Sequence, residues 1–170
     1  LVLRTSFGAS SLASSYPQAH LNHVSPETAL ALGADAVLMM AVIGGEDYYS
    51  LQPLAADIDA FHQYSIPVVV EIIAAEFNKT ATFDVQYNGA RIAAELGADA
   101  VKVFYVDDFE KVIECCPVPA ILAGGPKDRD INTVARHAVD CGARGFAFGR
   151  NIFQADDPLE VIGSLREILG

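Results

Sequence analysis

Lys102 interrupts a segment, Ala98-Asp99-Ala100-Val101-Lys102-Val103-Phe104-Tyr105, that is otherwise largely apolar and typical of a buried parallel strand. A buried ammonium group without a partner is costly, so this lysine must pair with an anion, lose its proton, or lie where the strand opens into a pocket. The last two conditions suit an amine nucleophile, which attacks a carbonyl carbon and forms a Schiff base. The alternative is a structural lysine whose ammonium group reaches solvent at a sheet edge.

An internal repeat favours the chemical role of this lysine. The sequence Leu-Gly-Ala-Asp-Ala-Val occurs at 32–37 and again at 96–101, and residues 141–146 repeat it more loosely. In each copy we expect the glycine to end a helix and the apolar residues to begin a strand. The position equivalent to Lys102 is apolar in the other two copies, so the lysine is the exception.

Two glycine-containing loops form a second candidate site. Gly124 and Gly125 directly follow one predicted strand, and Gly149 and Arg150 follow the next. Consecutive glycines at the carboxyl end of a parallel strand expose backbone N–H groups that can surround an anion. With Arg150 as a bidentate cation, these four residues are predicted to bind a phosphate group.

Both sites are expected at the same end of the sheet, because the carboxyl ends of parallel strands meet at one face. A phosphate bound by the glycine loops would anchor one end of a substrate and orient its carbonyl carbon toward Lys102. The structural alternatives are a plain turn at the glycines and a salt bridge from Arg150 to Asp156 or Asp157.

Two further residues are candidates for proton transfer. Glu71 lies within the buried strand pattern 68–73 and is a candidate general acid or base, with an ion pair to Lys102 as its structural alternative. Tyr105 closes the lysine strand and is a candidate proton donor near the imine, or else an aromatic residue at the rim. The histidines and cysteines show no pattern of metal ligands, so neither a metal nor another cofactor is predicted.

Six apolar segments rich in β-branched residues alternate with helical patterns, which indicates a parallel α/β sheet. The predicted strands are 1–5, 36–43, 66–73, 100–105, 119–123 and 145–148. One predicted helix opens at Ser25 and closes at Gly33, and the others lie at about 51–64, 84–96, 109–115, 130–141 and 158–169. No linker or low-complexity tract divides the chain, so residues 1–170 are predicted to form one domain.

Six βα units fit two architectures. One is an open doubly wound sheet, and the other is a (β/α)8 barrel that lacks its first two units. The residue pattern alone leaves both open. A barrel without two of its strands has two exposed sheet edges and an open core, so we expect these 170 residues alone to aggregate or pair with another chain.

Composition argues against several classes of protein. The formal net charge of −11 disfavours nucleic acid binding, which needs a basic surface, and 52% hydrophobic residues suffice for a substantial core. No apolar stretch reaches the roughly 18–20 residues of a membrane span, so no membrane partner is predicted. Three cysteines, two of them adjacent, fit no disulfide framework, which indicates a reducing, cytoplasmic location.

Three stretches carry a resemblance to a known family: 96–102, 116–127 and 149–154. They resemble the class I aldolases of the archaeal-type fructose-bisphosphate aldolase and deoxyribose-phosphate aldolase kind, often labelled DhnA-type. The resemblance covers the whole chain. It implies a (β/α)8 TIM barrel, a covalent imine on Lys102, phosphate bound by the two glycine loops, and frequently a decameric or other homo-oligomeric assembly.

Two features depart from the aldolases proper. The family's N-terminal strand, with an aspartate that helps proton transfer, would precede Leu1, and residues 73–76 replace a tyrosine followed by Pro-Arg-Gly. The second departure, together with residues 1–6 and 102–106, is similar to the branch that processes phosphorylated autoinducer-2. The resemblance implies that members of this branch act as aldolase-like thiolases with coenzyme A.

Three functions are therefore candidates, all with a phosphorylated small molecule as partner. The first is a lyase that forms a Schiff base at Lys102 and cleaves or forms a carbon–carbon bond in a phosphorylated sugar or ketone. The second is thiolase-like acetyl transfer from a phosphorylated dione to coenzyme A as co-substrate. The third is a non-catalytic sugar-phosphate-binding protein, which Glu71 in place of family residues keeps open.

Overall fold

The computed structural model describes residues 1–7, 19–124 and 130–170 of the chain. These residues form one six-stranded parallel sheet in the strand order β1 to β6. The strands are β1 (Val2–Arg4), β2 (Ala36–Ile43), β3 (Val68–Ala74), β4 (Ala100–Val103), β5 (Ala120–Ala123) and β6 (Gly145–Ala147).

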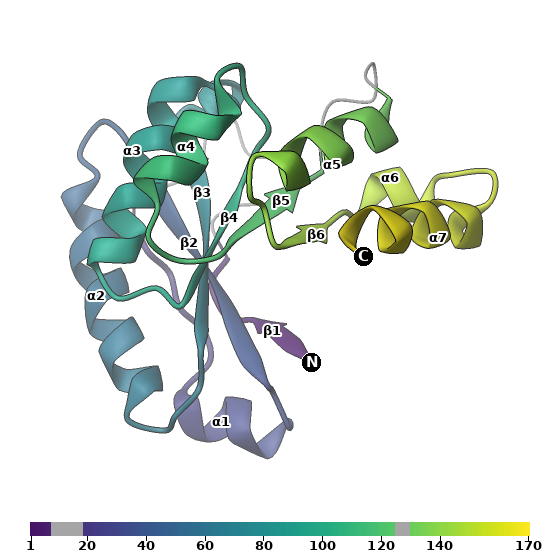
Figure 1. The fold of residues 1–170 in the computed structure, drawn as a ribbon. Helices are drawn as coiled ribbons and strands as arrows, with labels where there is room; N and C mark the ends of the chain where they lie inside the picture. Colours follow the sequence, from purple (N-terminus) through teal and green to yellow (C-terminus); the bar gives the residue numbers. More distant parts are fainter. Residues whose placement is uncertain (8–18, 125–129) are drawn as a thin grey trace.

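The sequential strand order decides between the two predicted architectures. A doubly wound sheet reverses its strand order at a switch point, whereas each strand here pairs with the next strand of the chain. The strands with their helices form a half-barrel, the six-unit part of a TIM-barrel-like fold (Figure 1). The predicted barrel architecture is therefore confirmed for these six units.

Helices connect the strands and cover one face of the sheet. They are α1 (Pro26–Ala31), α2 (Tyr48–His62), α3 (Phe83–Glu95), α4 (Phe109–Cys115), α5 (Ile131–Asp140), α6 (Arg150–Phe153) and α7 (Pro158–Leu169), with a 3-10 helix η1 (Phe77–Lys79) after β3. Ser25, Asp130 and Asp157 begin α1, α5 and α7 by accepting hydrogen bonds from backbone N–H groups of the first turn. Within the described residues, no helix combines the length and apolar character needed to cross a lipid bilayer.

The two faces of the sheet have different neighbours. Helices α2, α3 and α4 pack on one face of the central strands, where the larger hydrophobic core lies (Figure 1). The opposite face carries a small separate cluster: Met40, Val42, Ile73 and Ala75, with Phe104 packed against it. Since side chains alternate along a strand, Glu71 and Lys102, which are in register with Met40, also lie on this second face.

Candidate active site

Lys102 has an anionic partner on the neighbouring strand. Glu71 on β3 and Lys102 on β4 are register partners in the parallel ladder. The Lys102 Nζ lies 2.6 Å from Glu71 Oε1, and the two side chains are only 15% and 8% exposed. Of the three possibilities that the sequence left for the lysine, the structure therefore shows pairing with an anion, at a position partly open to solvent.

Arg4 supplies a second cation to the same carboxylate. Its Nη1 lies 3.0 Å from Glu71 Oε2, so each carboxylate oxygen of Glu71 contacts a different cation. The arginine begins on β1 and reaches across β2, where its Nη2 lies 2.7 Å from Met40 Sδ. Sequence reasoning missed this residue, because only the order and register of β1, β2 and β3 bring position 4 to position 71.

The cluster of Arg4, Glu71 and Lys102 has a net charge of +1 when all three groups are ionised. A carboxylate with so little exposure is costly unless it is paired and hydrogen-bonded, and here two cations pair with it. Glu71 Oε1 is also within hydrogen-bond distance of the lysine amine, so the carboxylate can exchange a proton with it. The geometry therefore places an amine beside a carboxylate that can accept its proton, on the sheet face opposite to helices α2 to α4.

The two predicted phosphate loops come together at the carboxyl ends of β5 and β6. A Cβ placed on Gly124 would lie 2.8 Å from Asn151 Oδ1, so only glycine fits at this approach of the two loops without a shift. Gly149 directly precedes the short helix α6, on which Arg150 is the first residue. Gly125 lies outside the described residues.

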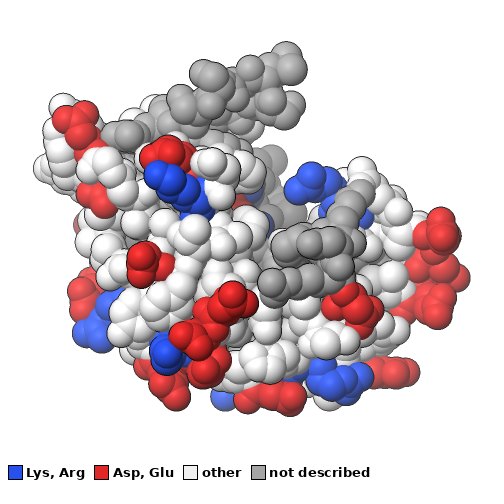
Figure 2. Space-filling model, turned by 90° about the horizontal axis from the view of Figure 1, so that it is seen from above, with Lys and Arg blue, Asp and Glu red and all other residues white. Residues whose placement is uncertain are grey.

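The salt bridge considered for Arg150 is not formed with either of its two candidate partners. The structure gives no ion pair of this arginine with Asp156 or Asp157, and the Asp157 carboxylate instead accepts hydrogen bonds from the backbone N–H groups of Leu159 and Glu160. Figure 2 views the end of the molecule toward which the strands point; acidic side chains are scattered over this face and its edge, and lysines and arginines are fewer. Arg150 is exposed at the start of α6, next to Asn151, whose side chain Gly124 approaches.

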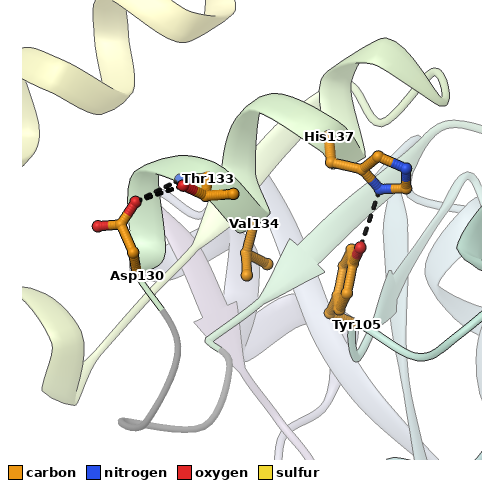
Figure 3. A pocket seen from close by; sticks show the side chains of 5 residues that line it. All are labelled: Tyr105, Asp130, Thr133, Val134 and His137. Atoms are coloured by element: carbon orange, nitrogen blue, oxygen red, sulfur yellow. Dashed lines mark hydrogen bonds between the residues drawn. The ribbon is translucent and has the colours of Figure 1, made fainter.

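Tyr105 lies on the other side of the sheet from the cluster of charges. Its hydroxyl is hydrogen-bonded to His137 Nδ1 at 2.9 Å, and its ring stacks on Phe109 at a centroid distance of 5.3 Å. With Asp130, Thr133 and Val134 of the α5 segment, Tyr105 and His137 line a pocket of about 410 Å³ (Figure 3). The structure therefore brings Glu71 to Lys102 and does not bring Tyr105 to it, and the role of Tyr105 as proton donor stays a prediction without structural support.

The cysteines provide no activated nucleophile. Burial raises the pKa of the thiols of Cys115, Cys116 and Cys141, which disfavours the reactive thiolate at neutral pH. In residues 1–7, 19–124 and 130–170, no group of three or more His, Cys, Asp or Glu side chains is placed to hold a metal ion.

Comparisons with known proteins find a family and relatives for this chain. A model of the DeoC/LacD family aldolases matches residues 7–155. A 3-hydroxy-5-phosphonooxypentane-2,4-dione thiolase of Yersinia pestis (strain Pestoides F) is 36% identical over 99% of this chain and 58% of its own length. The thiolase of the same description from Enterobacter sp. (strain 638) is also 36% identical, over 86% of this chain and 50% of its own length.

Solved structures extend the likeness to the fold. The structure of a Schiff-base-forming fructose-1,6-bisphosphate aldolase, determined with reaction intermediates, superposes with a TM-score of 0.88 at 30% identity and covers 100% of this chain and 71% of its own. The structure of an archaeal fructose 1,6-bisphosphate aldolase gives the same TM-score and identity over 99% of this chain and 70% of its own.

The present chain spans 50–58% of the length of the two thiolases, so the comparison concerns part of a longer protein in each case. The family model nevertheless matches most of the chain, including the strand of Lys102 and the loop that begins at Gly149. The family predicted from the sequence motifs is confirmed: the chain belongs to the DeoC/LacD family of aldolases.

Proposed function

We propose that this protein is a class I aldolase-type lyase that forms a Schiff base between Lys102 and a phosphorylated sugar or ketone. One observation carries the proposal: the Lys102 side chain is only 15% exposed, its Nζ lies 2.6 Å from Glu71 Oε1, and the pair is on the side of the sheet opposite to helices α2 to α4. A structural lysine would also need such an anion, so the proposal depends equally on the position of the amine, which is partly open to solvent. Membership of the aldolase family supports the same reading.

The proposed reaction begins when the unprotonated Lys102 amine attacks the substrate carbonyl carbon. Glu71 takes up the proton that the amine loses, the carbinolamine then releases water, and the product is an iminium. A base then removes the proton of the hydroxyl group beyond the neighbouring carbon–carbon bond, and this bond breaks. Its electron pair enters the iminium, which becomes an enamine, and the new carbonyl compound leaves as the first product. Protonation of the enamine and hydrolysis of the imine then release the second product and restore Lys102.

The two glycine loops would bind the substrate phosphate in this reaction. Gly124, Gly125 and Gly149 would offer backbone N–H groups, and Arg150 would supply the cation. Phosphate binding holds the carbonyl carbon near the amine, and this orientation accounts for part of the rate enhancement.

A second candidate function is thiolase-like acetyl transfer from a phosphorylated dione to coenzyme A. The observation that favours it is the 36% identity with two 3-hydroxy-5-phosphonooxypentane-2,4-dione thiolases. Analysis of the acyl products formed with and without coenzyme A separates the two functions. Formation of acetyl-coenzyme A after coenzyme A is added would favour the thiolase. Carbon–carbon cleavage without coenzyme A would favour the lyase.

Borohydride trapping tests the common chemistry. The full-length protein is incubated with dihydroxyacetone phosphate and related phosphorylated ketones and then reduced with borohydride. The modified peptide is mapped by mass spectrometry. We expect a stable adduct on Lys102 that is lost in Lys102→Met and retained in Lys111→Met, whose lysine pairs with Asp108 on the surface. Absence of an adduct while phosphate ligands still bind would overturn the proposal and favour a non-catalytic sugar-phosphate-binding protein.

A further inference from the structure

We propose that Arg4 is a positioning residue that holds Glu71 against Lys102 and allows the lysine to react as a neutral amine. The inference deepens the proposed function and rests on it, because an amine must be unprotonated to form a Schiff base. Arg4 itself is placed to contact the carboxylate and not the reacting carbonyl group.

The contacts of Arg4 fix its guanidinium group. Its Nε donates to the Ser6 carbonyl oxygen at 3.2 Å, Nη1 lies 3.0 Å from Glu71 Oε2, and Nη2 lies 2.7 Å from Met40 Sδ. All three nitrogens thus have a partner, and the planar group has one defined orientation across β2. A lysine at this position could carry the charge but could not reproduce three directed contacts.

The second cation changes what happens when Lys102 loses its proton. In an isolated buried pair, deprotonation of the lysine would leave an unpaired carboxylate, so the ammonium form would be strongly favoured. Here Glu71, whose side chain is 8% exposed, keeps its contact with the permanently charged Arg4 when the lysine becomes neutral. Arg4 also repels the ammonium form of the lysine, and both effects favour the free amine.

The side chains next to the pair on its own row of the sheet carry no charge. On the same row of the sheet, the register neighbours of Glu71 and Lys102 are Met40 on β2 and Ile121 on β5, and neither side chain ionises. Glu71 forms its ion pairs with the cations of β1 and β4, so the cluster contains two cations and one carboxylate in this part of the chain.

The experiment measures the reactivity of Lys102 without a substrate. The full-length protein is acetylated with a trace of acetic anhydride over a series of pH values, and the labelling of Lys102 relative to Lys111 is determined by mass spectrometry. Without Arg4 the Glu71 carboxylate would bind the Lys102 ammonium group alone, so we expect Arg4→Met to lower the relative labelling of Lys102 about tenfold at pH 7. Glu71→Gln removes the anion instead and should raise the labelling at the same pH.

Two variants serve as references. Arg91→Met removes an exposed arginine whose partner, Glu95, lies one helical turn away, and should leave the labelling of Lys102 unchanged. Arg4→Lys keeps the positive charge without the directed contacts. The relative labelling of Lys102 in this variant should lie between the values for the wild-type protein and Arg4→Met. Arg4 is 43% exposed, and Glu71 keeps Lys102 as a partner when Arg4 is replaced. The circular dichroism spectrum checks that each variant folds.

The labelling experiment tests the role of Arg4, and the trapping experiment tests the Schiff-base function, so either claim can be contradicted without the other. Unchanged labelling in Arg4→Met, or shifts in the same direction in Arg4→Met and Glu71→Gln, would overturn the role of Arg4 even if the wild-type protein forms the borohydride adduct. Absence of that adduct would overturn the Schiff-base function itself. If the wild-type protein forms the adduct, the Arg4→Met variant should be trapped more slowly at pH 7, and its rate of trapping should approach the wild-type rate as the pH rises. Equal slowing at every pH would contradict the proposal.

Discussion

At the scale of single residues, Gly89 makes the closest approach of a helix glycine to the sheet. It lies on α3, and a Cβ added to it would be 2.3 Å from Ile72 Cγ2 and 3.1 Å from Ile43 Cγ1. Ile72 is fully buried and β-branched, so its side chain cannot move aside without disturbing the core. Gly89 therefore sets how closely α3 packs on β3, the strand that carries Glu71.

Gly89→Ala is expected to lower the free energy of unfolding by about 1–3 kcal/mol, because the added methyl group overpacks the core. Gly163→Ala is the matched control, since Gly163 lies within α7 and a Cβ there meets no atom within 4 Å. In the control the helix propensity of alanine should raise stability by about 0.5–1 kcal/mol. Urea unfolding of the full-length variants measures both values, and equal shifts of the same sign would contradict the packing argument.

The residues of the site differ in how far the sequence predicts them. The ion pair of Glu71 with Lys102 was one of two predicted alternatives, because two charges in neighbouring buried strands need partners. Tyr105 was placed near the imine, although it is separated from Lys102 by an odd number of positions and side chains alternate between faces along a strand. Arg4 was beyond prediction, since its contact depends on the register of three strands that the sequence pattern does not fix.

At the scale of secondary-structure elements, the apolar and β-branched runs predict each of the six strands of the sheet. The predicted and observed strands differ only in the residues at which they begin and end. The predicted strand 66–73 begins at Val68 in the structure, where the ladder with β2 also begins, directly after Pro67, which has no N–H group to donate. The four-residue helix α6 was not predicted, because one turn shows no apolar period. Yet this helix carries Arg150, so short connecting elements contribute to the site and are hard to read from the sequence.

Gln86 joins three elements through its side chain. It is fully buried on α3; its Nε2 donates to the Thr80 carbonyl oxygen at 2.6 Å, and its Oε1 accepts from the Phe104 N–H group at 2.9 Å. One amide thus satisfies backbone groups after η1 and after β4. The segment that follows the lysine strand is fixed to α3 in this way.

Gln86→Leu is expected to lower the free energy of unfolding by about 1–3 kcal/mol for each backbone group that it leaves unpaired in the interior. Gln63→Leu replaces an exposed glutamine that donates only to Asp59, and should change stability by less than about 0.5 kcal/mol. Hydrogen exchange of the Phe104 amide gives a local readout and should accelerate in Gln86→Leu alone. Unaltered exchange at this amide would contradict the proposed bridge.

At the scale of the whole molecule, the parallel half-barrel places the candidate amine and the phosphate loops at one end. Lys102 is on β4 and Arg150 follows β6, two strands further along the sheet. Two strand spacings amount to about 10 Å, a distance that an extended phosphorylated ketone can span. The strand order, and not any single residue, therefore matches the proposed anchor to the proposed nucleophile.

This arrangement predicts that Arg150 acts on binding of the phosphate and not on the chemical step. Arg150→Ala should raise the concentration of dihydroxyacetone phosphate needed for half-maximal borohydride trapping roughly tenfold, since a hydrogen bond to a charged group contributes about 1.5–3 kcal/mol. Saturating substrate should restore the adduct, and trapping of unphosphorylated dihydroxyacetone should be unaffected. Arg166→Ala, on the exposed side of α7, is the control with wild-type behaviour. An equal loss of trapping with both ketones would instead mean that Arg150 maintains the fold of the loop, because a phosphate contact cannot act on a substrate that has no phosphate.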